Sequence, residues 1–212
     1  DWNGTVVNTL DKTINGKDNA NYPPSANNAS KTALTWRKYL DEQYANGIWN
    51  TNACPIVIRY AEVLLTYAEA VNELSGPSAD VYDKLDLIRG RVGMPKVDRE
   101  KYASKETLRR LIRRERGVEL AGEGVRRADI LRWKDDNGKM VAETVLNGVL
   151  ERVVGTVNYA ETDPTKRAEI DTNAPATDKK IEDRVFKVHN RYNPIPQGAI
   201  DNNPNLEQNP GY

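Results

Sequence analysis

The chain has 212 residues, 38% hydrophobic and 29% charged, which suffices for one ordinary domain or for part of a larger one. Thirty-one basic residues balance thirty-one acidic ones, so no net charge attracts nucleic acid or anionic lipid. No apolar run approaches the roughly 18 residues that a membrane-spanning helix needs. The single cysteine, Cys54, excludes an internal disulfide, and we expect its thiol to be a small buried apolar group.

Residues 1–54 form an irregular, loop-rich segment, punctuated by Gly, Asn, Ser and the pair Pro23-Pro24. Within it, residues 34–44 carry enough apolar and aromatic side chains for a strand or a short helix. The sequence opens on Asp1 with no initiator Met, basic n-region or apolar h-region. We therefore expect the targeting signal to lie outside the sequence and the segment to continue from a missing N-terminal part.

A first helical hairpin is predicted over residues 55–92. Apolar residues recur at helical spacing from Pro55, which suits a first helical turn, and Gly76-Pro77 ends that helix. A second helix follows over 79–92. The connection between them is short, which favours an antiparallel pair.

A second hairpin is predicted over residues 104–133. Ser104 suits an N-cap, the glycine-containing stretch 121–124 ends the helix, and residues 125–133 form a short fourth helix. The shared face of the third helix is predicted to contain Leu108, Leu111, Ile112, Glu115, Val118 and Glu119. Two successive hairpins resemble tetratricopeptide-type units, which need neighbours to bury their faces.

The remainder, residues 140–212, is predicted to be irregular. Residues 141–158 fit helix or strand equally, 161–180 have loop composition, and 185–192 alternate as a strand does. The tail is rich in Pro and Gly, and three apolar side chains are expected to anchor it: Ile195, Ile200 and Leu206. The predicted fold class is therefore mostly α, with tetratricopeptide-like hairpins, long irregular loops and little β.

Three sequence blocks follow one another in a characteristic order. They are Ile56–Ala70 with 87–95 (LIRGRVGMP), Arg113–Gly124 with Leu131-Arg132-Trp133, and the close of the chain, Asn193–Gln197, Ile200–Leu206 and Gln208–Tyr212. Together they resemble the C-terminal region of RagB/SusD proteins over residues 55–212. One departure is the stretch 126–129 (RRAD), where relatives usually place an aromatic residue before the Asp.

The resemblance implies a SusD-like fold of the α/α superhelix type. It also implies a non-catalytic lipoprotein, lipid-anchored at the outer-membrane surface of Bacteroidetes, that captures oligosaccharide or polysaccharide for a TonB-dependent, SusC-like transporter. The lipidated cysteine of such proteins is N-terminal, so Cys54 is not the anchor. Their ligand-contacting loops lie mostly upstream of the matching segment.

Sugar binding needs flat aromatic faces for the apolar side of a ring and amides for its hydroxyls. Both occur before the first helix, although core packing is the ordinary role of any one aromatic. The candidate glycan-binding residues are Trp36, Tyr39, Tyr44, Trp49 and Asn50. Trp133 follows an amphipathic helix, and we expect it in the core.

The basic stretch 109–116 raises the question of nucleic-acid binding. Glutamates alternate with its arginines, which favours ion pairs at i,i+3 and i,i+4, and no aromatic residue interleaves it. We therefore predict no nucleic-acid partner. Glu115 or Glu119 is instead predicted to pair with Arg132 in the helix packing.

Catalytic and metal motifs are weak. His189 is the single histidine, and Asp135-Asp136 lies in a predicted turn, where paired acids are usually solvated. The tail begins like a calcium loop at Asp201 but has Leu206 where the loop needs Gly. We expect no catalytic residue, metal or cofactor. The alternatives to glycan capture are a protein-interaction module without a sugar site and, less favoured, a glycan-active hydrolase.

Overall fold

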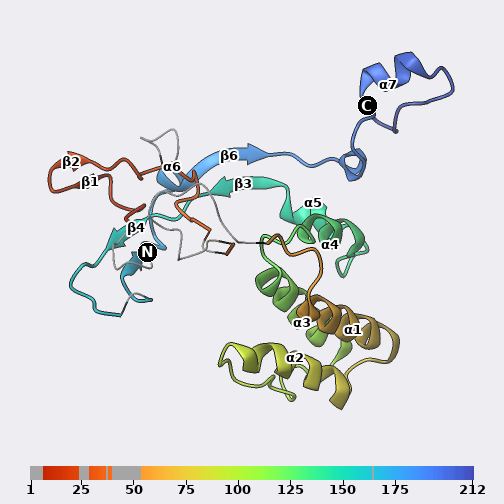
Figure 1. Cartoon of the computed structure of the whole chain (residues 1–212), viewed down its shortest axis with the longest axis horizontal. Coiled ribbons are helices and arrows are strands. Elements are labelled where there is room, and N and C mark those ends of the chain that lie inside the picture. Colours follow the sequence, from red (N-terminus) through yellow and green to blue (C-terminus); the bar gives the residue numbers. More distant parts are fainter. Residues whose placement is uncertain (1–6, 24–28, 37, 40–53, 164) are drawn as a thin grey trace. The chain divides into compact units, whose positions relative to one another are not determined.

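The computed structural model describes residues 7–23, 29–36, 38–39, 54–163 and 165–212. Contacts divide the chain into two units, which we call the helical unit (Ala53–Ile130) and the strand unit (Asp1–Asn52 with Leu131–Tyr212). Figure 1 shows long helices in the first and short paired strands in the second. No helix in the described part of the chain is both long and apolar enough to cross a membrane.

Helices form at the four positions where they are predicted, and three of them lie wholly in the helical unit. Helix α1 (Tyr60–Ser75) packs against both α2 (Ala79–Arg91) and α3 (Lys105–Glu119), as Figure 1 shows, and α4 (Arg126–Arg132) begins at the end of the unit. The mostly helical prediction is confirmed. The first helix nevertheless starts at Tyr60, not at Pro55, because Arg59 is extended (φ −136°, ψ 162°). Its guanidinium is held by the carboxylates of Glu119, at the end of α3, and Glu123, beyond α3.

Local signals fix the helix ends as the sequence predicts. Gly76 follows α1 with φ 79°, a conformation that disfavours residues with a Cβ, and donates its N–H to Asn72 O at 3.0 Å. The Ser104 hydroxyl accepts from Thr107 N at 3.2 Å, and Thr107 Oγ1 accepts from Ser104 N at 3.2 Å. This reciprocal capping box starts α3.

One hydrophobic core lies among α1, α2 and α3. Leu65, Leu85, Leu108 and Ile112 are completely buried there. Val118, which we predicted on the same face, is instead 73% exposed. The buried stripe of α3 follows positions 108, 112 and 116, spaced by four residues, so a residue at 118 points toward solvent.

The strand unit is built from short antiparallel pairs. Strands β1 (Thr13–Ile14) and β2 (Lys17–Asp18) form a hairpin whose turn, Asn15-Gly16, has positive φ at both residues, as a tight hairpin turn requires. Two further pairs follow: β3 (Gly148–Glu151) with β6 (Lys180–Arg184), and β4 (Gly155–Val157) with β5 (Ala168–Ile170). The short helices are α5 (Val141–Val145), α6 (Ala176–Lys179), a 3-10 turn (Val188–Arg191) and α7 (Gln197–Asn202).

Several sequence assignments change in this unit. The ambiguous range 141–158 contains a helix and then two strands, and the predicted loop 161–180 contains β5 and α6. The strand predicted at 185–192 is wrong, because β6 ends at Arg184. The Asn147 amide accepts from Phe186 N at 2.6 Å and donates to Phe186 O at 3.1 Å, so a side chain replaces the partner strand there.

Trp133 is buried, at 3% exposure, which confirms its predicted place in a core. Its carbonyl accepts from Val141 N at 3.0 Å, which closes the intervening turn. Cys54, in contrast, is exposed, and the prediction of a buried thiol is wrong. It lies in the stretch before α1, outside the core, where Val57 and Ile58 are also exposed.

The last twenty residues fold back on themselves, although they contain little regular structure. The Gln208 amide exchanges two hydrogen bonds with the backbone of Ile195, at 2.8 and 2.9 Å. Asn209 Nδ2 donates to Asn193 O at 2.7 Å, and the Tyr212 hydroxyl donates to Tyr192 O at 2.9 Å. Side-chain hydrogen bonds therefore hold the closing sequence block in a folded-back conformation. Its three apolar residues at 195, 200 and 206 are half-buried.

Candidate functional site

The predicted aromatic residues are only partly described. Trp36 and Tyr39 lie in the strand unit and are 64% and 37% exposed. Tyr44, Trp49 and Asn50 lie outside the described residues. An indole that is two-thirds exposed has a free face on which a sugar ring can stack.

The segment that carries Trp36 is anchored from two sides. Thr32 O accepts from Val153 N at 3.0 Å, and Ala33 O accepts from the Thr9 hydroxyl at 2.8 Å. Ala33 itself is buried, with a positive φ of 62°. Trp36 thus follows directly after a fixed turn, which limits the conformational entropy that it loses when it binds a ligand.

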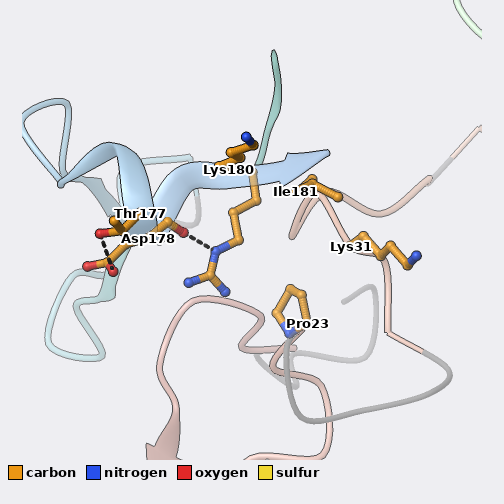
Figure 2. Close-up of a pocket in the computed structure, with 7 residues that line it drawn as sticks. Pro23, Lys31, Thr177, Asp178, Lys180 and Ile181 are labelled. Atoms are coloured by element: carbon orange, nitrogen blue, oxygen red, sulfur yellow. Dashed lines mark hydrogen bonds between the residues drawn. The ribbon is translucent and has the colours of Figure 1, made fainter. Parts of the chain in front are cut away.

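A cavity of about 540 Å³ lies on the strand unit, a volume typical of ligand pockets. Figure 2 shows its lining residues: Pro23, Lys31, Arg152, Thr177, Asp178, Lys180 and Ile181. We call it the cationic pocket, because three of these side chains are basic and one is acidic. None of them was among the candidates from the sequence.

Two segments of the second half of the chain build one wall of this pocket. Arg152 follows β3, at the irregularity in its pairing with β6, and its N–H donates to Lys179 O at 2.8 Å. Lys180 and Ile181 begin β6, and the preceding short helix α6 supplies Thr177 and Asp178. Strand pairing therefore brings Arg152 beside residues almost thirty positions later.

The Arg152 guanidinium is fixed by three contacts. Its Nε donates to Asp178 O at 2.5 Å, its Nη2 donates to the Tyr22 hydroxyl at 3.1 Å, and its Cζ lies 5.1 Å from the centroid of the Tyr22 ring. Tyr22 is itself held by a turn, since its N–H donates to Asn19 O at 3.0 Å. The cation is thereby preorganised before any ligand arrives.

Glu115 and Glu119 form ion pairs with arginines of other segments, and their predicted pairing with Arg132 stays a prediction. Glu115 Oε1 accepts from Arg89 Nη1 at 2.5 Å, and Glu119 Oε1 accepts from Arg59 at 2.5 Å and from Arg91 at 2.8 Å. These pairs join different segments of the helical unit. The Glu123 carboxylate, and then Glu119, raise the pKa of the Arg59 guanidinium against the opposing effect of burial. Arg132 lies with its guanidinium 5.2 Å from the Trp133 ring.

A buried ion pair between α3 and α4 was not predicted from the sequence. Arg116 and Asp129 are 4% and 3% exposed, and two hydrogen bonds of 3.0 and 3.1 Å join them. Arg116 also donates to the Thr66 hydroxyl at 3.0 Å. The signal was present, because Leu108, Ile112 and Arg116 share one stripe at spacing four, and an arginine on an apolar stripe requires a buried acceptor.

The residues considered for catalysis, His189 and Asp135, make contacts that hold local structure in place. His189 packs edge-on against Tyr212 with a centroid distance of 4.9 Å, and a Cβ at Gly211 would lie 2.7 Å from it. Asp135 caps its own turn by accepting from the backbone of Asn137 and Lys139 at 2.9 Å. Within the described ranges, no group of three or more His, Cys, Asp or Glu side chains is arranged to hold a metal ion. The site as built can stack, hydrogen-bond and attract negative charge.

The comparisons with known proteins agree with this fold. The model of the SusD family matches residues 1–212, so the chain belongs to the SusD family. The match includes the first 54 residues, which lie before the range over which the sequence blocks carry the resemblance.

Individual relatives are longer than this chain. SusD-like protein P25 of Formosa agariphila is 34% identical over 143 residues, which cover 62% of this chain and 27% of the relative. The crystal structure of a SusD-like protein from Bacteroides fragilis NCTC 9343 matches with a TM-score of 0.56 and 27% identity, over 74% of this chain and 26% of that one. The chain thus spans about a quarter of the length of these relatives.

Proposed function

We propose that this chain is part of a non-catalytic surface protein that captures glycans and delivers them to a TonB-dependent, SusC-like transporter. Membership of the SusD family supports a role in glycan binding for nutrient uptake. For this chain, the proposal rests on the exposed indole of Trp36. This residue lies three positions after Ala33, whose carbonyl is anchored by a hydrogen bond from Thr9. Tyr39, which is exposed three residues later, adds a second aromatic group to the same segment.

The structure favours capture over cleavage for a chemical reason. Glycoside hydrolysis needs two carboxyl groups placed on either side of one bond, with one of them held protonated. The acidic side chains of the pocket and of the Asp135 turn accept hydrogen bonds from their own backbone or neighbouring hydroxyls. Such roles position loops, which supports capture over cleavage.

Affinity electrophoresis over a panel of soluble polysaccharides, with a reducing-end assay on the same samples, tests capture. We expect selective retardation of the 212-residue chain without new reducing ends. Trp36→Ala should abolish most of the retardation, because stacking on a sugar ring depends on the indole face. Leu34→Ala is the matched control, since Leu34 is also exposed, at 63%, and lies in the same segment. Retardation accompanied by new reducing ends would indicate a hydrolase instead.

Surface anchoring and transporter contact are the further parts of the proposal. We propose that the mature protein is surface-exposed and held at the outer membrane by an N-terminal lipid. Proteolytic shaving of intact cells should remove the protein, and it should copurify with a TonB-dependent transporter from solubilised outer membranes. Resistance to shaving, or copurification with cytoplasmic proteins alone, would contradict this location.

A protein-interaction module is the second candidate, and one observation favours it. Helix α1 exposes apolar side chains along one side, among them Tyr60 at 70%, Val63 at 52% and Leu74 at 85%. Helical hairpins of repeat type bury such faces against a neighbour. A stable partner that is lost with Leu74→Glu, combined with no retardation by any polysaccharide, would favour this alternative.

A further inference from the structure

The cationic pocket is locally positive, although the chain as a whole has a formal net charge of zero. Lys31, Arg152 and Lys180 line it, against the single carboxylate of Asp178. Lys180 is also within 2.7 Å of the exposed Asp183 carboxylate, so part of its charge is balanced outside the pocket. Lys31 and the anchored Arg152 remain the main sources of positive potential, and a concave surface strengthens such a potential.

Arg152 has an unused donor. Its Nε and Nη2 bind Asp178 O and the Tyr22 hydroxyl, whereas Nη1 is buried and has no hydrogen-bond partner among the described residues. Buried polar groups in proteins nearly always find a partner, and a buried guanidinium nitrogen without one calls for an acceptor from outside. A negatively charged oxygen is the strongest such acceptor.

We propose that the cationic pocket binds an acidic sugar residue, with its carboxylate or sulfate group on Arg152 and facing Lys31. The shared chemistry is an anionic oxygen group on a sugar ring. This inference rests on the proposed capture of glycans, and it narrows that function to acidic glycans. Binding requires Arg152 Nη1, which is buried in this structure, to become accessible to the anion and donate to it.

The other polar groups of the pocket distinguish a sugar from an acidic peptide. Asp178 and the Thr177 hydroxyl can accept hydrogen bonds from ring hydroxyls, of which every sugar residue has several. The carboxylate side chains of an acidic peptide offer no such donors and are repelled by Asp178. A sugar ring that carries both hydroxyls and one anionic group therefore fits the pocket better than a polycarboxylate peptide.

The test measures binding of the 212-residue chain to matched probes by affinity electrophoresis and calorimetry. The probes are polygalacturonate and its carboxyl-reduced neutral form, dextran sulfate and dextran, and polyglutamate. We expect polygalacturonate or dextran sulfate to bind more tightly than its neutral counterpart, and the preference to weaken as salt is added. Which of the two binds identifies carboxylate or sulfate as the recognised group.

Three variants assign the binding to this pocket. Arg152→Gln should weaken binding of the acidic probe about tenfold, since it removes a charge-assisted hydrogen bond. Lys31→Gln, which leaves the contacts of Arg152 intact, should weaken it about threefold and tests the pocket even if Arg152→Gln disturbs the local fold. Lys166→Gln is the control: it removes the same charge from an exposed pair with Asp163 in the strand unit and should change nothing.

The outcomes separate this inference from the proposed function. Equal binding of neutral and acidic glycans would overturn the inference and leave glycan capture standing. Binding of no glycan of either kind would overturn both. Equal or tighter binding of polyglutamate would identify an acidic peptide ligand, and an acidic preference that survives both pocket variants would place the anion elsewhere; either result overturns the inference.

Discussion

The helical unit and the strand unit are ordered by different forces. In the helical unit, side chains such as Leu65, Leu85 and Ile112 are fully removed from water around one core. In the strand unit, the longest strand has five residues and all of β5 is exposed. Amide side chains there hydrogen-bond to backbone groups that a neighbouring strand would otherwise bind. Asn147 does so at Phe186, and Gln208 does so at Ile195.

This difference separates a scaffold from a recognition surface. Hydrophobic burial contributes roughly 25 cal/mol per Å² and stabilises the helices, whereas each net hydrogen bond contributes only about 1 kcal/mol. A unit that relies on hydrogen bonds can hold irregular loops in place with their surfaces open. The exposed Trp36 and the cationic pocket both lie in that unit.

The largest effect is expected at the buried ion pair of the helical unit. Arg116→Leu removes the guanidinium that makes two hydrogen bonds to the buried Asp129 carboxylate, and it should lower the free energy of unfolding by about 3–5 kcal/mol. Urea denaturation followed by circular dichroism measures the loss. The double variant Arg116→Leu with Asp129→Leu should recover much of it. A double variant no more stable than the single one would show that the loss comes from the missing pair itself, and not from the buried carboxylate that remains.

The second-largest effect is expected from shortening a side chain in the core of the helical unit. Leu65→Ala creates a cavity at a fully buried position and should cost about 3 kcal/mol. Leu150→Ala, at a partly buried position in β3, should cost less than half as much and is the matched control from the strand unit. Hydrogen exchange resolved along the chain assigns each loss to its own unit. Equal losses at the two positions would contradict the contrast between the units.

Amide contacts should dominate in the strand unit. Asn147→Asp keeps the shape and the acceptor for Phe186 N but removes the donor to Phe186 O and Glu143 O. We expect a local loss of about 1–3 kcal/mol, because backbone carbonyls lose a partner. Faster hydrogen exchange at residues 143–147 and 184–188, with the helices unchanged, is the expected measurement. Unchanged exchange there would mean that the amide is dispensable.

The smallest effect concerns a half-buried ion pair, Glu73 with Arg109, and depends on pH. The hydrogen bond from Arg109, at 2.5 Å, lowers the pKa of the Glu73 carboxyl in the folded state. A lowered folded pKa gives stability that is present above the unfolded pKa and lost as the pH falls through the folded pKa. Glu73→Gln should therefore cost less than about 1 kcal/mol at pH 7, because solvent screens the pair, and nothing at strongly acidic pH. A cost that persists in acid would rule out the ion pair as its source.

Much of the helical unit was predictable because its signals are local. The capping box at Ser104, the ending at Gly76 and the spacing of apolar residues act within one or two turns of the chain. The exceptions, Arg59 and Val118, depend on partners or on a helix face that tertiary packing selects. The candidate site was predictable only as a set of exposed aromatic groups, of which Trp36 is the clearest described case.

The sequence by itself determined the positions of the four main helices, most of their ends and the family, because periodicity, caps and ordered sequence blocks are read along the chain. Only the tertiary structure decided the cationic pocket. Arg152 forms hydrogen bonds with Tyr22, 130 positions away in the sequence, and with Asp178, 26 positions away. Short strands and loops have too little periodicity for such contacts to be predicted from the sequence. Their positions depend on hydrogen bonds between distant segments, which exist only after the chain has folded.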